Sequence, residues 1–199
     1  MGRVQEEGKP SMDGTEKYAR RYTQLLDNYI IEVRERFQDV AAYCQSPIES
    51  ALLAELQFMG SGYGDGGGCL LFTPVSELKD FSYIFGGLPD MSLAAMPQAK
   101  WGNYRIDIAI FGQGPARNGQ LCMAVECDGH DFHEKTKSQA ARDKARDRAL
   151  TAGGWHVFHF TGSEIYADAE KCAIELTTFA SLWMEKQIDI HLDALRKAK

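Results

Sequence analysis

The amino-acid sequence predicts an α/β domain that carries an N-terminal helical extension. The chain has 199 residues, which is enough for one domain with a substantial core. It is 44% hydrophobic and 25% charged, as globular proteins usually are. Segments with helical and strand-like patterns alternate along the chain, which is typical of the α/β class. We expect a flexible N-terminus over residues 1–14, a helical extension over residues 15–44 and the domain over residues 45–199.

The helical extension is predicted from a long apolar stripe. Apolar residues recur at steps of three and four over residues 16–43, as on one face of a helix. They are Tyr18, Tyr22, Leu25, Leu26, Tyr29, Ile30, Val33, Phe37 and Val40. Such a stripe must be covered, so we expect the domain, a second copy of the chain or a protein partner to pack on it.

A second helix is predicted from Ser46 to about Phe58. Serine caps helices, Pro47 suits a first turn, and Glu49 is favoured near a positive helix N-terminus. A further helix over residues 137–152 is expected to stop at the following two glycines. The last predicted helix is amphipathic and follows residue 161.

Two strands stand out. Residues 104–111, YRIDIAIF, alternate isoleucines with Arg105, Asp107 and Ala109, and residues 121–127, LCMAVEC, are apolar enough to be buried on both faces. The loop GQGPARNGQ should join them as a hairpin. Residues 155–160 form the next predicted strand, and residues 69–75 are a weaker candidate. Residues 80–100 are rich in Gly, Pro and Met, and we expect them to be irregular.

The composition disfavours several classes of protein. The sequence contains no run of about 18 apolar residues, so no membrane span is predicted. The five cysteines are odd in number and have no CxxC spacing, which favours reduced thiols in a cytoplasm. The net charge of −6 disfavours a protein that coats phosphates. Local charge matters more, however, and residues 135–148 contain six cations against two acids.

An acidic cluster follows the second clear strand. The sequence VECDGHDFH, residues 125–133, places Glu126, Asp128 and Asp131 close together. Crowded carboxylates repel one another unless a positive group lies between them. Asp107, on the neighbouring hairpin strand, can lie beside Glu126 at one edge of the sheet. Converging carboxylates suit Mg²⁺, and Glu49 is a candidate third carboxylate through water.

A basic stripe is predicted on the helix after this cluster. Its members Lys135, Gln139, Arg142 and Arg146 are spaced four, three and four residues apart, which places them on one face. Beside a metal-binding edge, such a stripe would grip phosphates or stabilise developing negative charge.

Simpler interpretations compete with this one. Asp107 taken alone fits a solvent-facing residue, and Asp147 fits an ordinary helix-surface ion pair. His156 and His159 lie on opposite faces of their strand, as packing or surface residues do. His130 and His133 could bind zinc with Cys127 or Asp128, although their spacing matches no recognised ligand pattern. The residues of this zinc alternative are therefore His130, His133, Cys127 and Asp128.

Together, these motifs resemble a known family. Glu49 in SPIES, Asp107 in RIDIAI, the cluster VECDGHDFH and the run ARDKARDRALTAGGWHVFHFTGSEI occur in this order. Over residues 46–175 the chain resembles the very-short-patch repair endonuclease-like branch of the PD-(D/E)XK nucleases. The resemblance implies a restriction-endonuclease-like fold, in which helices flank a mixed central sheet. It also implies cleavage of DNA phosphodiesters with Mg²⁺, for which Mn²⁺ can substitute.

The resemblance also assigns roles to residues. Asp107 and Glu126 would be metal ligands, together with the main-chain carbonyl of Cys127. Glu49 would be the helix-borne acid, and His133 an acid/base near the attacking water. Arg146 and Asp147 would belong to the helix that supports the site. The roles implied concern Glu49, Asp107, Glu126, Cys127, His133, Arg146 and Asp147.

The chain departs from the superfamily motif at one position. Asp128 stands where the motif has lysine, and members of this branch commonly carry aspartate there. Lys135, Gln139 and His133 remain candidates to orient the water. We therefore expect a Mg²⁺-dependent DNA endonuclease of repair, restriction or defence. The alternative is a catalytically weak nuclease-fold module that binds nucleic acid or a protein partner.

Overall fold

The computed structural model describes residues 12–61, 69–71, 82–129 and 137–198. The chain forms two compact units, residues 1–38 and residues 39–199. None of the helices in these described ranges is long and apolar enough to cross a membrane.

The first unit contains most of helix α1, Met12–Ala41. The predicted helix over residues 16–43 is therefore confirmed, with bounds shifted by a few residues. Tyr18, Tyr22 and Leu25 lie on one stripe of α1 and are exposed, at 74%, 70% and 56%. Val40, at the other end of α1, belongs to the second unit and is fully buried in its core.

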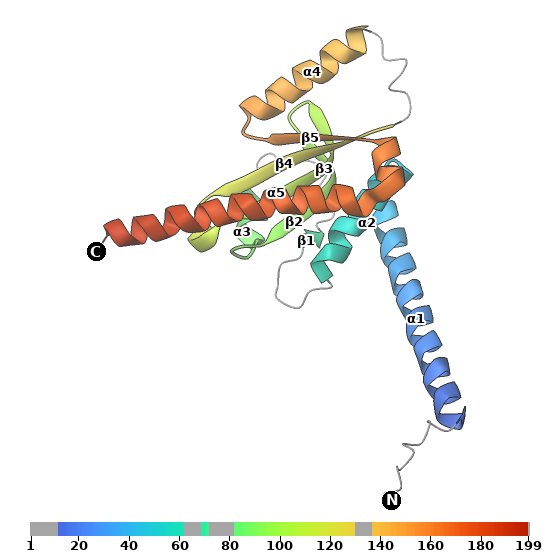
Figure 1. Cartoon of the computed structure of the whole chain (residues 1–199). Coiled ribbons are helices and arrows are strands. Elements are labelled where there is room, and N and C mark those ends of the chain that lie inside the picture. Colours follow the sequence, from blue (N-terminus) through green and yellow to red (C-terminus); the bar gives the residue numbers. More distant parts are fainter. Residues whose placement is uncertain (1–11, 62–68, 72–81, 130–136, 199) are drawn as a thin grey trace, which may run out of the picture. The chain divides into compact units, whose positions relative to one another are not determined.

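The second unit is built on a mixed five-stranded sheet in the order β1-β2-β3-β4-β5 (Figure 1). The central strands β2, β3 and β4 pair antiparallel, whereas β1 and β5 pair parallel to their neighbours. The strands are β1 (Cys69–Leu71), β2 (Leu93–Trp101), β3 (Tyr104–Gln113), β4 (Gln120–Asp128) and β5 (His156–Thr161). The expected mixed sheet flanked by helices is confirmed.

Helices cover both faces of this sheet. Helices α2 (Pro47–Ser61) and α5 (Gly162–Lys197) pack on one face, and α3 (Ser82–Gly87) and α4 (Lys137–Ala152) on the other. We call the two cores the α2/α5 cluster and the α3/α4 cluster. The first includes Leu52, Leu56, Ile108, Val125, Phe160 and Leu176; the second includes Ile84, Phe85, Ala109, Phe111, Leu150 and Trp155. Two separate cores produce the three layers of an α/β sandwich.

Local sequence signals explain how the elements end. Gly154 takes a left-handed φ of +87°, which a helix C-terminus needs, and α4 stops there as predicted. Thr161 ends β5 and caps α5 at once, because its hydroxyl accepts from Glu164 N–H while the Glu164 carboxylate accepts from Thr161 N–H. No loop separates β5 from α5.

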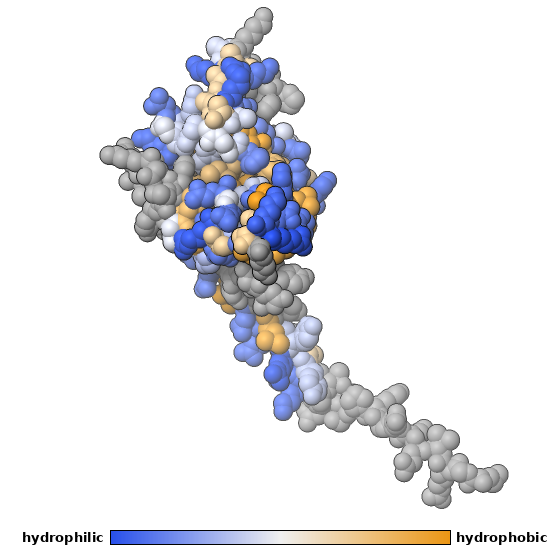
Figure 2. All heavy atoms as spheres, turned by 90° about the vertical axis from the view of Figure 1, so that its left-hand side faces the viewer, coloured by the Kyte–Doolittle hydropathy of each residue, from blue (hydrophilic) through white to orange (hydrophobic). Residues whose placement is uncertain are grey.

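Helix α5 is interrupted near its start. Asp168 has φ −164° and ψ 81°, and its carboxylate accepts a hydrogen bond from Lys171 N–H at 2.9 Å. A new helical run therefore starts after Asp168 and continues to Lys197. Its last turns expose Ile188, Leu192 and Leu195, and Figure 2 shows hydrophobic side chains scattered over a mostly hydrophilic surface on that side. Scattered exposed apolar residues are normal.

The prediction of irregular structure over residues 80–100 is wrong. Those residues include α3 and most of β2. The strand sequence LAAMPQAKW lacks alternation, because alanines fill positions on both buried faces. Pro97 is tolerated since the described pairing of β2 with β1 covers only residues 93–95. The weaker strand candidate, residues 69–75, is confirmed as β1 over Cys69–Leu71, and residues 72–75 lie outside the described part.

Candidate active site

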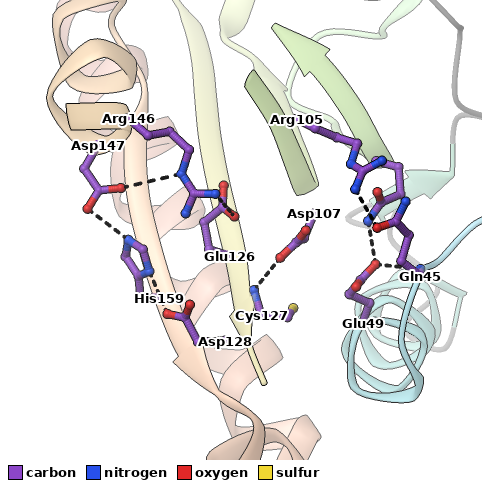
Figure 3. Close-up of polar contacts among 11 residues, drawn as sticks. Gln45, Glu49, Arg105, Asp107, Glu126, Cys127, Asp128, Arg146, Asp147 and His159 are labelled. Atoms are coloured by element: carbon purple, nitrogen blue, oxygen red, sulfur yellow. Dashed lines mark hydrogen bonds and ion pairs between the residues drawn. The ribbon is translucent and has the colours of Figure 1, made fainter. Parts of the chain in front are cut away.

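The site is organised by the register of the β3–β4 hairpin. Ile108 pairs with Val125 at the end of the ladder, so Asp107 and Glu126 come next on the two strands. Residues opposite each other in an antiparallel pair point to the same face. The Asp107 carboxylate also reaches along this end, where its Oδ2 accepts a hydrogen bond from Cys127 N–H at 2.9 Å (Figure 3). The two carboxylates therefore share one end of the hairpin.

The β2–β3 ladder is interrupted beside Asp107. Pairs form on either side, but Gln98 and Asp107 do not bridge. Gln98 has a left-handed φ of +54°, which is rare for a residue with a side chain. After it, Ala99 packs in the α3/α4 cluster with Met96, although strict alternation would put these two residues on opposite faces. The turn in the strand lets Gln98 reach α2.

Gln98 and α2 meet at Glu49, which is 5% exposed. Its Oε2 accepts hydrogen bonds from Gln98 Nε2 at 2.6 Å and Gln45 N–H at 2.9 Å, and its Oε1 accepts one from Ser46 Oγ at 2.8 Å. Because Gln98 must turn its amide nitrogen toward a carboxylate, its Oε1 faces elsewhere and is buried without a hydrogen-bond partner. Arg105 holds the same loop by donating to Gln45 Oε1 at 2.6 Å.

Glu126 is buried and half-satisfied. Its Oε2 pairs with Arg146 Nη1 of α4 at 3.0 Å, and the residue is 3% exposed. Its Oε1 is buried and has no hydrogen-bond partner among the described residues. An unsatisfied buried carboxylate oxygen is costly unless another group or ion meets it.

A second set of contacts surrounds this pair. His159 of β5 lies opposite Glu126 in the parallel ladder. Its ring places Nδ1 2.9 Å from Asp128 Oδ2 and Nε2 3.3 Å from Asp147 Oδ2. Asp147 Oδ1 in turn lies 4.0 Å from Arg146 Nε. Figure 3 shows these side chains converging from β4, β5 and α4.

Burial controls the acidity of the two central carboxyls. The pKa of Glu126 is raised to about 8, mainly by desolvation and also by the charge of Asp107, against the lowering effect of Arg146. Desolvation also raises the pKa of Asp107, against the lowering effect of the Cys127 N–H bond. The charge of Glu49 adds to the rise at Asp107. A cation placed between these carboxyls would favour their ionised forms.

The chemistry of the side chains at this site bears on whether a divalent metal can bind there. The donors are hard oxygens: two carboxylates and a main-chain carbonyl, and one carboxylate oxygen is buried without a partner. Mg²⁺ is usually bound by one or two carboxylates, with water and phosphate oxygens completing the shell. Within the described ranges no group of three or more His, Cys, Asp or Glu side chains is placed to hold a metal. The donor set therefore suits a hard divalent cation whose shell water or phosphate oxygens would complete.

The structure brings together most, but not all, of the predicted site residues. Those gathered at this end of the sheet are Glu49, Asp107, Glu126, Cys127, Asp128 and Arg146. Gln139 and Arg142 are exposed on α4, nearer its start. His130, His133 and Lys135 lie outside the described residues, so their predicted roles remain predictions.

Three residues were missed or interpreted differently from the sequence. Gln98 lay in the segment predicted to be irregular. His159 was interpreted as a packing or surface residue; it is exposed, as that interpretation has it, and it also contacts two carboxylates. Asp147 contacts His159 as well as its neighbour Arg146, so it is more than a helix-surface ion-pair residue. Spacing alone could not find them, because the register between β4 and β5 depends on tertiary packing.

The zinc alternative receives no support from Cys127. Cys127 is buried, and desolvation raises the pKa of its thiol far above the ordinary value. Zinc binds the thiolate, which such burial disfavours. The histidines of that alternative lie outside the described residues.

Residues 83–179 match the family model REase_MTES_1575, which describes a restriction endonuclease-like family. The match spans α3 to α5 and includes Asp107, Glu126 and Arg146. It supports a nuclease-fold family, and the mixed sheet flanked by helices is consistent with a restriction endonuclease-like fold. The narrower very-short-patch repair branch stays a prediction. No curated protein matches the chain. No solved structure matches it either.

Proposed function

We propose that this protein is a metal-dependent endonuclease that hydrolyses DNA phosphodiester bonds. The observation that carries the proposal is the pairing of half-buried Asp107 with buried Glu126 on adjacent strands, where Oε1 of Glu126 has no hydrogen-bond partner among the described residues. The family match supports it, because restriction endonuclease-like folds generally use divalent metals and bind DNA. We assign Mg²⁺ as the cofactor, with Mn²⁺ as a substitute, in repair, restriction or defence.

The residues would divide the work as follows. Asp107, Glu126 and the carbonyl of Cys127 would hold Mg²⁺, which polarises a phosphoryl oxygen and acidifies a water when bound. Glu49 is fixed by three hydrogen bonds and would order the water on the α2 side. Arg146, 3.0 Å from Glu126, would offset negative charge on the phosphorane-like transition state.

Plasmid cleavage tests the proposal. Supercoiled DNA is incubated with wild type, Asp107→Asn, Glu126→Gln and the double variant, in Mg²⁺, Mn²⁺ or EDTA. Asp189→Asn, an exposed acid on α5, is the matched control, and circular dichroism verifies folding. We expect metal-dependent nicking by wild type and control, with a loss of about 100-fold or more in both site variants. No cleavage of supercoiled, linear, single-stranded or mismatched DNA contradicts the proposal.

One observation favours a second candidate, a nuclease-fold module that binds without cutting. Arg146 already contacts Glu126 at 3.0 Å, and Asp128 occupies the position of the motif lysine. For such a module, gel-shift binding to DNA would be the same in EDTA and Mg²⁺, with no product formed. An endonuclease would instead consume the DNA when metal is added.

We further propose that α1 mediates self-association. Tyr18, Tyr22 and Leu25 form an exposed stripe on a helix that belongs mainly to its own unit. Light scattering on the full chain and on residues 39–199 measures this directly, since a cut at 38 keeps the buried Val40. We expect a dimer for the full chain and a monomer for the truncated one. An unchanged oligomeric state rules out α1 as the interface.

A further inference from the structure

His159 connects two carboxylates that belong to different elements. One ring nitrogen lies 2.9 Å from Asp128 at the end of β4, and the other 3.3 Å from Asp147 on α4. Asp147 leads to Arg146, and Arg146 leads to Glu126 on β4. We call this series the His159 chain. It leaves β4 at Asp128, passes through β5 and α4, and returns to β4 at Glu126 (Figure 3).

Along the His159 chain, carboxyl groups alternate with the guanidinium of Arg146 and the imidazole of His159. Glu126, Asp128 and Asp147 are acidic, and neighbouring carboxylates repel one another. Arg146 lies between Glu126 and Asp147, and His159 lies between Asp147 and Asp128. The two ring nitrogens of His159 therefore face one carboxylate each, Asp128 at the end of β4 and Asp147 on α4.

We propose that His159 is a positioning residue, which holds Asp147 so that Arg146 stays against Glu126. This inference rests on the proposed nuclease function. Among the described residues, Arg146 Nε has no hydrogen-bond partner and lies 4.0 Å from Asp147 Oδ1, while Arg146 Nη1 lies 3.0 Å from Glu126 Oε2. With Arg146 fixed on Oε2, the other oxygen of Glu126 stays directed away from it, where a metal or water can meet it.

The alternative is that His159 is an ordinary strand residue, and β5 offers a matched control. His156 is exposed, lies three residues earlier on the same strand and packs its ring against Phe179 of α5, with centroids 4.9 Å apart. Within the described part of the chain, it makes no hydrogen bond or ion pair with an acidic residue. Replacing either histidine removes one imidazole from β5, but only His159 connects β4 with α4.

Cleavage kinetics test the role. At saturating metal, we expect His159→Ala to lower kcat about tenfold, as loss of a supporting partner commonly does, while KM for DNA changes less than about twofold. His159→Gln keeps one donor and should recover part of the loss. His156→Ala should match wild type. Equal kcat for wild type and His159→Ala overturns the proposal, as does an equal loss in both alanine variants.

A measurement without metal or DNA separates this inference from the proposed function. Side-chain ¹H–¹⁵N spectra follow the Arg146 guanidinium, assigned by its absence in Arg146→Lys. We expect slowed exchange with water in wild type and His156→Ala, and loss of that protection in His159→Ala. Unchanged protection of the Arg146 guanidinium in His159→Ala overturns the positioning role of His159, even if the enzyme is active. Wild-type protein that cleaves no DNA overturns the proposed function, and the catalytic part of this inference with it.

Discussion

Single residues at this site keep unfavourable states that the surrounding structure imposes. Gln98 holds a left-handed backbone, and Glu126 keeps a buried oxygen without a partner. Each state costs free energy in the folded protein, and such costs cluster at functional sites. The two residues flank Asp107, one on each neighbouring strand. The site thus consists of a strained strand and an undercompensated acid on either side of one carboxylate.

The strain at Gln98 can be separated from its hydrogen bond. Gln98→Ala and Gln98→Gly both lose the 2.6 Å bond to Glu49, but only alanine keeps a Cβ at φ +54°. We expect the glycine variant to be more stable than the alanine variant by about 1 kcal/mol, measured by urea unfolding. Equal stabilities would mean that the backbone at residue 98 relaxes.

The raised pKa of Glu126 makes stability depend on pH. Because its folded pKa is about 8 against an ordinary 4.5, the metal-free folded state keeps a proton that the unfolded state has lost between these values. The free energy of unfolding should therefore fall as pH rises from about 5 to about 8, by at most about 1.4 kcal/mol per pH unit from this group. Glu126→Gln should flatten the fall.

Two other carboxyls bear on that experiment. Asp107 also has a raised pKa, so part of the slope remains in Glu126→Gln. The pKa of Glu164 is lowered by its hydrogen bonds to Thr161, and Glu164 is ionised in both states above about pH 5. Glu164→Gln is therefore the control and should keep the wild-type slope. A slope unaffected by Glu126→Gln would exclude Glu126 as its source.

At the scale of elements, local sequence signals predicted most of the fold. The isoleucines of β3, the apolar run of β4 and the glycines after α4 each have a short-range physical meaning, and those elements were confirmed. The prediction for the segment that contains β2 was wrong. Its central residues Pro97 and Gln98 disfavour a strand by propensity, and their conformation depends on tertiary contacts. His159 was missed for a related reason, since its partners come from another strand and helix.

Helix α2 offers a test of how an element positions the site. Ser46 precedes α2, and its hydroxyl accepts from Glu49 N–H at 3.3 Å and donates to Glu49 Oε1 at 2.8 Å. We expect Ser46→Ala to lower the free energy of unfolding by about 1 kcal/mol, because the cap is lost. Chemical denaturation measures this, with exposed Ser163→Ala on α5 as the control. A loss no larger than in the control would show that Ser46 does not stabilise α2.

At the scale of the whole molecule, charged side chains are unevenly distributed. The net charge is −6, yet α4 exposes Arg142, Lys144 and Arg148 on the helix that carries Arg146 to the site. DNA affinity must then come from a local patch, since the molecule as a whole repels phosphate. Binding should be weak and strongly reduced by salt.

The contribution of α4 can be measured from that salt dependence. For Arg142→Ala we expect the slope of log K against log salt to become shallower by about 0.9, the value for one lost phosphate contact. Fluorescence anisotropy with a labelled duplex in Ca²⁺ or EDTA gives the slope. Arg196→Ala, at the far end of α5, should keep the wild-type slope. An unchanged slope in Arg142→Ala would remove this residue from the DNA-binding surface.

The uninterrupted part of α5 has a practical consequence. From the break at Asp168 to Lys197 the helix continues without another break, which at about 1.5 Å per residue corresponds to a rod of about 44 Å. Helix α5 begins directly after β5, and its other end lies near the end marked C in Figure 1. A fluorophore at that end would keep a nearly constant separation from the acidic pair. Energy transfer to a dye on a DNA end would then report where along the duplex the protein stops.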